Sequence, residues 1–330
     1  MMTQRTFCFQ LCLALLVVAL AACSRIAPAE TLPTTTRVSV TNAVVAPTAQ
    51  VTRPSQASVA PTAAPVAPTS EPAQPIGEPQ SEPGMRVVAP IVDGSTGFLL
   101  GGTQHGRWLD PDATAQLLVG NERYRLYSGM TNLGEARGSR PVTESAGPCS
   151  GKHVVTLNPG PQVQPAMAIG GTWDLLPRQP QALALDSVVY REAMAGWLRS
   201  HGIDQPDVQL TAVQRIDLEG DGVDEALVSA TRLQDGGHVP SVAAGDYSVV
   251  VVRKLVADTV VTLPLVSEYY RQAQELAYPS THVIATILDV NGDGTQEIVV
   301  QSTSWEGSAT AIYAVHAGMV QQVGSVGCHE

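Results

Sequence analysis

Two copies of an acidic turn between apolar runs decide the expected fold of this chain. Residues 215–228 read RIDLEGDGVDEALV, and residues 287–300, which lie 72 positions later, read ILDVNGDGTQEIVV. Each copy places Asp, Asn, Glu and Gly in a short loop between stretches rich in Val, Ile and Leu. This pattern is typical of two β-strands joined by a tight turn. The duplication therefore predicts two similar β-units in the C-terminal part of the chain.

Two further β-rich runs follow each acidic turn. They cover residues 247–255 and 259–266 after the first turn, and residues 310–315 and 319–326 after the second. Each unit is therefore expected to contain four antiparallel strands, with the acidic turn between its first two strands.

The acidic turns also offer oxygen ligands at alternate positions. Calcium takes six to eight hard oxygen ligands, and oxygens at positions 1, 3, 5, 7 and 9 of a tight loop can converge on one ion. Glycine at position 6 permits the sharp backbone turn. The expected ligands are Asp217, Glu219, Asp221, the Val223 carbonyl and Glu225 in the first turn, and Asp289, Asn291, Asp293, the Thr295 carbonyl and Glu297 in the second. Asp, Asn and Gly also favour tight turns without metal, so a metal-free turn is the alternative at both places.

These loops resemble the calcium loops of FG-GAP and VCBS-type β-propeller repeats, in which the loop joins two strands of a blade. They are not EF-hand loops, because position 12 is Val228 or Val300 inside an apolar strand, where an EF-hand has Glu. The resemblance implies blade-like units and bound calcium. The chain departs from those repeats in having only two copies, whereas a closed propeller needs at least four blades. It also has Glu at position 9, where the repeats usually have Asp.

The N-terminus has the features of an export signal. One Arg precedes an apolar run over residues 7–20, which is shorter than the roughly 20 apolar residues needed to span a bilayer. A positive start, an apolar middle and small residues at the end predict a secretory signal. The stretch Leu20-Ala21-Ala22-Cys23 resembles the lipobox of bacterial lipoproteins, which implies removal of residues 1–22 and acylation of Cys23. A plain signal peptide that leaves Cys23 as a free thiol is the alternative.

A linker is expected between this anchor and the folded part. Residues 23–85 are rich in Pro, Thr, Ala and Ser and contain no aromatic residue, so they cannot bury enough apolar surface to offset the entropy of ordering. A disordered linker is therefore predicted, followed by an N-terminal α+β part over residues 86–204 and a two-repeat β part over residues 205–330. The expected fold class is α+β and mostly antiparallel β, with two four-stranded blade-like units and a smaller α/β N-terminal part.

Two helices and three short strands are expected in the N-terminal part. Asp110 followed by Pro is a typical helix start and predicts a helix to about residue 119. A second helix is predicted from residue 186 or 187 to residue 200, with Val189, Ala193 and Trp197 on one apolar stripe. Short strands are predicted at residues 97–101, 124–127 and 154–157.

Two cysteines, Cys149 and Cys328, remain beyond the anchor. An even pair in an exported chain favours a disulfide, and two buried free thiols are the alternative. A disulfide here would tie the C-terminal tail to the first half of the folded part and indicate one integrated domain.

Composition and motifs limit the function classes. The chain has 30 acidic and 19 basic residues and a net charge of −11, whereas nucleic-acid binding requires a basic footprint. An acidic surface suits an extracellular location and cation binding. No G-x-S-x-G, H-E-x-x-H or phosphate-loop motif is present.

The expected function is that of a non-catalytic binding or structural module. A lipid would anchor it to the outer side of the bacterial cell membrane or to the outer membrane, and its partner would be an extracellular protein or glycan. An extracellular hydrolase acting on glycans or peptides is the main alternative. A solute-binding transporter subunit is disfavoured, because the sequence lacks alternating strands and helices. The layout of anchor, linker and β-rich head resembles that of bacterial lipoproteins without an assigned activity, which implies no function.

Overall fold

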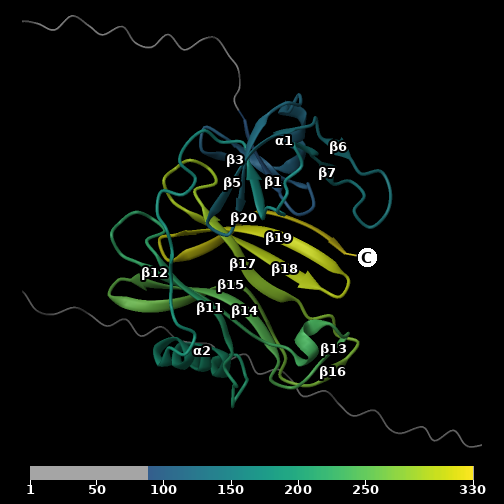
Figure 1. The fold of residues 1–330 in the computed structure, drawn as a ribbon. Helices are drawn as coiled ribbons and strands as arrows, with labels where there is room; N and C mark the ends of the chain where they lie inside the picture. The colour runs from purple at the N-terminus through teal and green to yellow at the C-terminus, as the bar shows by residue number, and fades with distance from the viewer. Residues whose placement is uncertain (1–87, 330) are drawn as a thin grey trace, which may run out of the picture. The chain divides into compact units, whose positions relative to one another are not determined.

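Antiparallel β-strands dominate the computed structural model, which describes residues 88–329 (Figure 1). These residues belong to one compact unit. The predicted fold class, α+β with mostly antiparallel β-structure, is confirmed. The predicted signal sequence, Cys23 and the linker lie outside the described residues. No helix within residues 88–329 is long and apolar enough to cross a membrane.

The N-terminal part is built around a seven-stranded sheet with the strand order β3-β2-β1-β9-β4-β5-β8. The strands are β1 (Ala89–Asp93), β2 (Leu99–Gln104), β3 (Arg107–Leu109), β4 (Arg123–Ser128), β5 (Thr131–Gly138), β8 (Leu157–Asn158) and β9 (Met167–Ile169). A separate pair contains β6 (Val142–Thr143) and β7 (His153–Val154). The three short strands predicted in this part overlap β2, β4, and β7 with β8.

The two predicted β-units are present as consecutive antiparallel meanders. The first meander has the order β10-β11-β12-β14-β15, with β10 (Gln181–Ala182), β11 (Leu210–Ile216), β12 (Glu225–Arg232), β14 (Tyr247–Val256) and β15 (Thr259–Tyr269). The second has the order β17-β18-β19-β20, with β17 (Thr281–Leu288), β18 (Glu297–Ser304), β19 (Gly307–His316) and β20 (Met319–His329). The acidic turns join β11 to β12 and β17 to β18, as predicted. The first meander differs in carrying β10 as an additional edge strand.

Three small elements lie outside the two meander sheets, two of them between β12 and β14 and one between β15 and β17. A 3-10 helix, η1 (Gln234–Gly237), follows β12, and the short strands β13 (Ser241–Val242) and β16 (Gln274–Glu275) pair with each other.

The first helix, α1 (Pro111–Leu117), begins where its capping residues predict. Asp110 is the N-cap, and its Oδ1 accepts a hydrogen bond from the Ala113 amide at 2.7 Å. This bond satisfies one of the amides that have no partner within the first helical turn.

The second helix, α2 (Val188–Ser200), packs against the first meander through Met194 and Leu198, which are fully buried, with Trp197 partly buried beside them. The expectation that Val189 lies on the buried stripe is wrong, because its side chain is 64% exposed. Five residues separate Val189 from Met194, which places the two about 140° apart around the helix axis. Both α2 and β10 precede residue 205, the expected boundary between the two parts, and both associate with the first meander.

The second meander is buried on both faces. Val299 of β18 packs in a cluster with Ile91 and Met167 of the N-terminal sheet. Its neighbours Ile298 and Val300 pack in another cluster with residues of the first meander. Successive side chains of a strand point to opposite faces, so this central sheet is covered on one side by the N-terminal sheet and on the other by the first meander.

Candidate functional site

In the first acidic turn, Asp217 organises the loop backbone. Its Oδ1 accepts hydrogen bonds from the amides of Gly220 and Asp221 at 2.7 and 3.1 Å, and its Oδ2 accepts one from Gly222 at 2.9 Å. Gly222 has a φ of 86°, a conformation that glycine adopts at little cost. Burial alone would raise the pKa of Asp217, but the three amides and Arg178 stabilise the carboxylate and lower it.

Two other carboxylates of the first turn contact a lysine. Lys254, on β14, is 7% exposed, and its ammonium donates hydrogen bonds to Glu219 Oε2 and Glu225 Oε1. Glu225 is 1% exposed and also accepts a hydrogen bond from the Leu218 amide at 2.9 Å. Burial would lower the pKa of Lys254, but the hydrogen bonds and charges of the two glutamates raise it. Two carboxylates of the first turn, Glu219 and Glu225, are therefore paired with a cation from β14.

The second acidic turn has the same hydrogen-bond frame. Asp289 accepts hydrogen bonds from the amides of Gly292 and Gly294 at 2.7 and 3.0 Å. Glu297 Oε2 accepts one from the Val290 amide at 2.8 Å, which repeats the contact between Glu225 and Leu218. The two loops therefore place their first and ninth positions in the same way.

Positions 3 and 5 of the second turn contact each other. Asn291 Nδ2 donates to Asp293 Oδ2 at 2.8 Å, and Asn291 Oδ1 accepts from the Asp293 amide at 2.9 Å. Asp293 Oδ1 also accepts from the Thr295 amide at 2.7 Å. Because these oxygens are bound to groups of the loop itself, a metal ion would have to replace some of these hydrogen bonds.

Among the described residues, the carboxylates of the second turn have no partner equivalent to Lys254. In the first meander Ala226 pairs with Arg253, and this register places Lys254 beside Glu225. In the second meander the equivalent pair is Ile298 with Tyr313. The same register therefore places Ala314 beside Glu297. Within residues 88–329, none of the acids of the second turn forms a salt bridge. The position that holds an ammonium in one copy therefore holds a methyl group in the other.

The missing counter-charge changes the proton affinity of the second turn. Burial, together with the charges of Asp293 and Asp289, raises the pKa of Glu297 from 4.5 to about 8. Burial also raises the pKa of Asp289, against the opposing effect of the loop amides. Asp217, the equivalent of Asp289 in the first turn, has a lowered pKa. The second turn thus buries a carboxyl group that no described cation pairs with, and ionising this group is costly for the folded state.

A segment that precedes β10 crosses both turns. Trp173 Nε1 donates to the Asp289 carbonyl at 2.8 Å. The guanidinium of Arg178 donates to the Leu218 carbonyl at 2.8 Å and to the Gly294 carbonyl at 2.6 Å, so it links the first turn to the second. Neither residue has a sequence signal for this role, because both lie in an irregular Gly- and Pro-containing stretch without periodicity.

The predicted ligands therefore lie in the two loops as expected, but their side chains bond to loop amides, to Lys254 or to one another. Within the part of the chain that the structure describes, no three His, Cys, Asp or Glu side chains are grouped in a way that could hold a metal ion. The buried carboxylate of Glu297 without a salt bridge is the feature of the second turn that would favour a cation, whereas in the first turn Lys254 already pairs with Glu219 and Glu225. Calcium binding stays a prediction.

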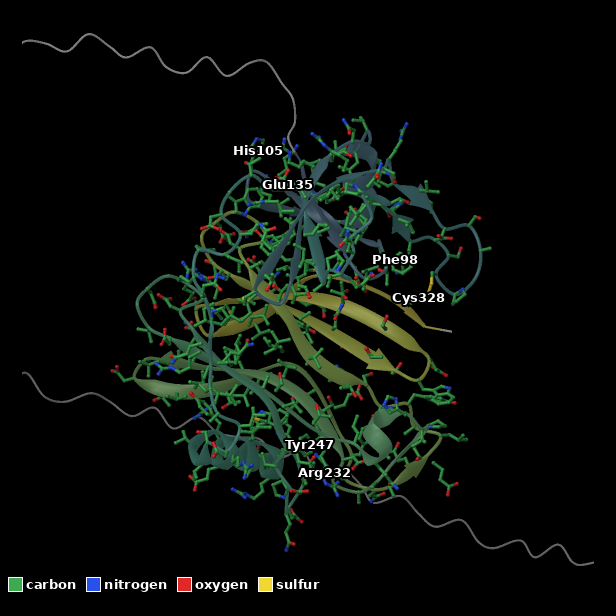
Figure 2. All side chains as sticks on the ribbon, viewed as in Figure 1. Phe98, His105, Glu135, Arg232, Tyr247 and Cys328 are labelled. Carbon is green, nitrogen blue, oxygen red and sulfur yellow. A yellow bond between two sulfur atoms is a disulfide. The ribbon has the colours of Figure 1, made fainter. Side chains whose placement is uncertain are left out.

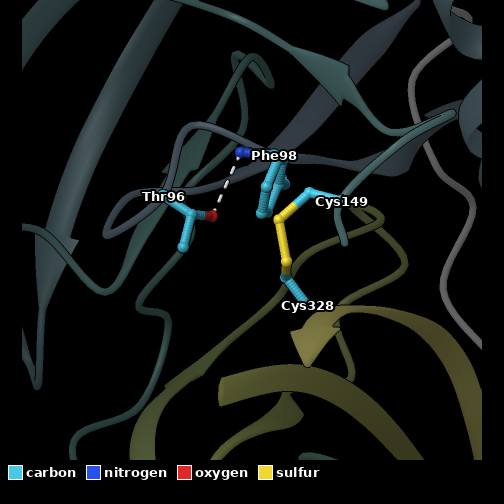
Figure 3. The surroundings of a disulfide bond; sticks show 4 residues. All are labelled: Thr96, Phe98, Cys149 and Cys328. Atoms are coloured by element: carbon cyan, nitrogen blue, oxygen red, sulfur yellow. Dashed lines mark hydrogen bonds between the residues drawn. A yellow bond between two sulfur atoms is a disulfide. The ribbon is translucent and has the colours of Figure 1, made fainter. Parts of the chain in front are cut away.

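Cys149 and Cys328 form a disulfide that joins the loop between β6 and β7 to the last strand (Figure 3). Their Cα atoms are 5.2 Å apart, and Phe98 lies beside the sulfur atoms (Figure 3). Both cysteines pack against the apolar cluster shared by the N-terminal sheet and the second meander.

A pocket of about 370 Å³ lies on the first meander and includes Asp207, Gln209, Arg232 and Asp246 in its wall. Arg232 (Figure 2) donates to Asp246 Oδ1 at 2.8 Å. Asp246 is 2% exposed and also accepts hydrogen bonds from the amides of Gln234 and Ala243. Its carboxylate is thus used to hold the surrounding loops.

Comparison with protein-family models, with curated proteins and with solved structures gives no match for this chain. The interpretation of the acidic turns therefore rests on their sequence and geometry alone.

Proposed function

We propose that this chain is a non-catalytic binding or structural module, anchored by lipid at Cys23 on the outside of a bacterial cell, and that calcium stabilises its second acidic turn. The observation that carries the proposal is the buried Glu297, which forms no salt bridge within residues 88–329, whereas its counterpart Glu225 is bonded to Lys254 of β14. A divalent cation would remove this cost, and calcium prefers carboxylate and carbonyl oxygens.

The residues that would hold the ion are the alternate positions of the loop. Asp289, Asn291, Asp293 and Glu297 would offer side-chain oxygens, and Thr295 its backbone carbonyl. Binding would supply positive charge to carboxylates that form no salt bridge within residues 88–329. We do not extend the proposal to the first turn, because an ammonium already contacts the carboxylates at its third and ninth positions.

The location is supported by two features. The lipobox-like stretch before Cys23 supports export and lipid anchoring, and the disulfide between Cys149 and Cys328 suits an oxidising compartment. External calcium is available there to a weak site. The partner would be an extracellular protein or glycan.

Thermal unfolding of the mature chain tests the calcium proposal. A Cys23→Ser form avoids the lipid, and its unfolding is measured with chelator and with about 10 mM calcium. Extracellular modules bind calcium with dissociation constants of about 0.1–1 mM, which predicts a stabilisation of roughly 1.4–2.7 kcal/mol. Asp289→Ala should abolish the effect, whereas the matched variant Asp217→Ala should keep it. An unchanged midpoint in the Cys23→Ser form would overturn the proposal.

The anchor is tested in cells. The chain with its native Cys23 should incorporate labelled fatty acid and fractionate with membranes, and the Cys23→Ser form should do neither. Recovery of both forms in the soluble fraction would contradict lipid anchoring.

Hydrolysis of a peptide bond is a second candidate function, favoured by one arrangement between the two meanders, with Glu268 on β15 and with His282 and Ser302 on β17 and β18. Ser302 Oγ lies 2.8 Å from His282 Nδ1, and His282 Nε2 lies 3.6 Å from Glu268 Oε1. A hydroxyl, an imidazole and a carboxylate in this order are the parts of an activated nucleophile. Covalent labelling by a fluorophosphonate that is lost in Ser302→Ala would support this activity, and an unlabelled protein would contradict it.

A further inference from the structure

Lys254 contacts two of the predicted ligands of the first acidic turn. It lies on β14, outside the loop, and its ammonium bridges the carboxylates at loop positions 3 and 9, Glu219 and Glu225. The side chains of Lys254 and Glu225 are 8% and 1% exposed, and that of Glu219 is 17% exposed. A buried charge is tolerated when it is paired and hydrogen-bonded, so these three side chains depend on one another.

The second turn shows that the loop frame does not require this lysine. The contact of the ninth position with the loop amide is 2.9 Å in the first turn and 2.8 Å in the second. The contact of the first position with the sixth amide is 2.9 and 3.0 Å. Ala314 replaces Lys254 in the register of the second meander. The two copies therefore share a backbone frame and differ in whether the chain supplies a cation.

We infer that Lys254 is a covalently attached substitute for a metal ion, so that the first turn is a latent calcium site that opens when this ammonium is removed. Three other basic side chains lie at the first turn and leave Glu225 to Lys254. Arg178 donates to the Leu218 carbonyl, and Arg215 pairs with Asp224, which is not a predicted ligand. His316 Nδ1 lies 3.6 Å from Glu219 Oε1 on a side chain that is 84% exposed. An exposed imidazole contributes little to such a site. The latent site in the first turn depends only on Lys254. The number of calcium ions bound by the unmodified chain depends on the function proposed for the second turn.

Calorimetric titration with calcium chloride tests the inference in the mature chain carrying Cys23→Ser. Lys254→Ala, which reproduces the alanine of the second meander, should raise the number of bound ions from one to two. In an Asp289→Ala background the same substitution should raise it from zero to one. Magnesium chloride serves as the control ion, because magnesium demands a stricter octahedral geometry and keeps its water.

The outcomes separate the two proposals. In one outcome the Cys23→Ser protein binds no calcium and its Lys254→Ala variant binds one ion. This result would overturn the calcium proposal for the second turn and support the latent site in the first. One ion in both proteins would overturn the latent site alone.

A second variant covers the case in which Lys254→Ala does not fold without metal. Lys254→Met/Glu225→Gln removes the charges of Lys254 and Glu225. This double variant should fold without calcium and should gain no calcium site. Recovery of the near-ultraviolet circular dichroism of Lys254→Ala by calcium would support the inference. Failure of calcium to restore Lys254→Ala, while the double variant folds, would overturn it.

Discussion

Replacing Glu297 by Gln is expected to stabilise the metal-free protein at alkaline pH. The pKa of Glu297 is about 8 in the folded state, against an ordinary value of 4.5. The folded state therefore holds this proton more tightly than the unfolded chain does. The resulting stabilisation is fully present below about pH 4.5 and is lost as the pH rises through about 8.

These two pKa values set the size of the effect. Each pH unit over which only the folded state keeps the proton changes the free energy of unfolding by about 1.4 kcal/mol. Between about pH 5 and pH 9 the contribution of Glu297 should fall by roughly 4 kcal/mol. Glutamine has the same shape and can still accept the hydrogen bond from the Val290 amide, which Glu297 accepts at 2.8 Å, so Glu297→Gln should lack this loss.

Urea unfolding in the presence of a chelator, repeated across this pH range, measures the difference between the two proteins. Glu225→Gln is the matched control in the first turn and should have the opposite effect near neutral pH, because it deprives the buried Lys254 of a partner. Parallel pH profiles for the unmodified protein and Glu297→Gln would refute the reasoning, and so would equal stabilisation by Glu225→Gln.

Three further perturbations address contacts other than those of the acidic side chains in the two turns. Cys328→Ser opens a covalent loop with a sequence separation of 179 and should lower the free energy of unfolding by up to about 5 kcal/mol in the chain-entropy model; an unchanged urea midpoint would contradict this. Arg178→Lys should cost about 2–4 kcal/mol in thermal unfolding, because one ammonium cannot reach the carbonyls of both turns, and full retention of stability would count against the bridge. Burial would raise the pKa of Glu268, but hydrogen bonds from His282 and Ser280 lower it. The ionised Glu268 therefore contributes to the free energy of unfolding above about pH 4.5, and this contribution is lost as the pH falls below that value. Glu268→Gln should flatten the acid limb of the plot of stability against pH, and an unaltered limb would refute this.

Local chemistry is enough to predict the two meanders. Gly222 and Gly294 have φ values of 86° and 89°, which single out glycine within each acidic turn. The apolar runs on either side have no turn residues, so each turn marks where one strand ends and the next begins. Local chemistry also predicts where α1 begins, because the side chains of Asp110 and Pro111 define the helix start. These features depend on residues that are close together in the sequence.

The contacts that decide the charge of each turn are not local. Lys254 is 29 residues from Glu225, and the two meet because of the register between β12 and β14. A sequence signal for this contact does exist: Lys254 lies in a strand with long valine runs, and a charge buried in such a strand needs a partner. That signal shows that a partner is needed but does not identify it. Trp173 and Arg178 give no comparable signal, because no period or turn rule governs their segment.

Under the two calcium proposals made above, metal dependence is decided by a neighbouring strand and not by the loop motif alone. A count of oxygen ligands gives two calcium turns, since Asp217 and Asp289 begin equivalent loops. A count of salt bridges to the buried carboxylates gives a different result, because Lys254 pairs with Glu219 and Glu225, whereas Glu297, which lies beside Ala314, forms no salt bridge within residues 88–329. The two counts differ in what they predict for Lys254→Ala: if ligand oxygens alone governed binding, the substitution would leave the number of ions unchanged. If buried charge governs it, the first turn gains an ion, and the copy without a lysine is the one that needs calcium in the natural chain.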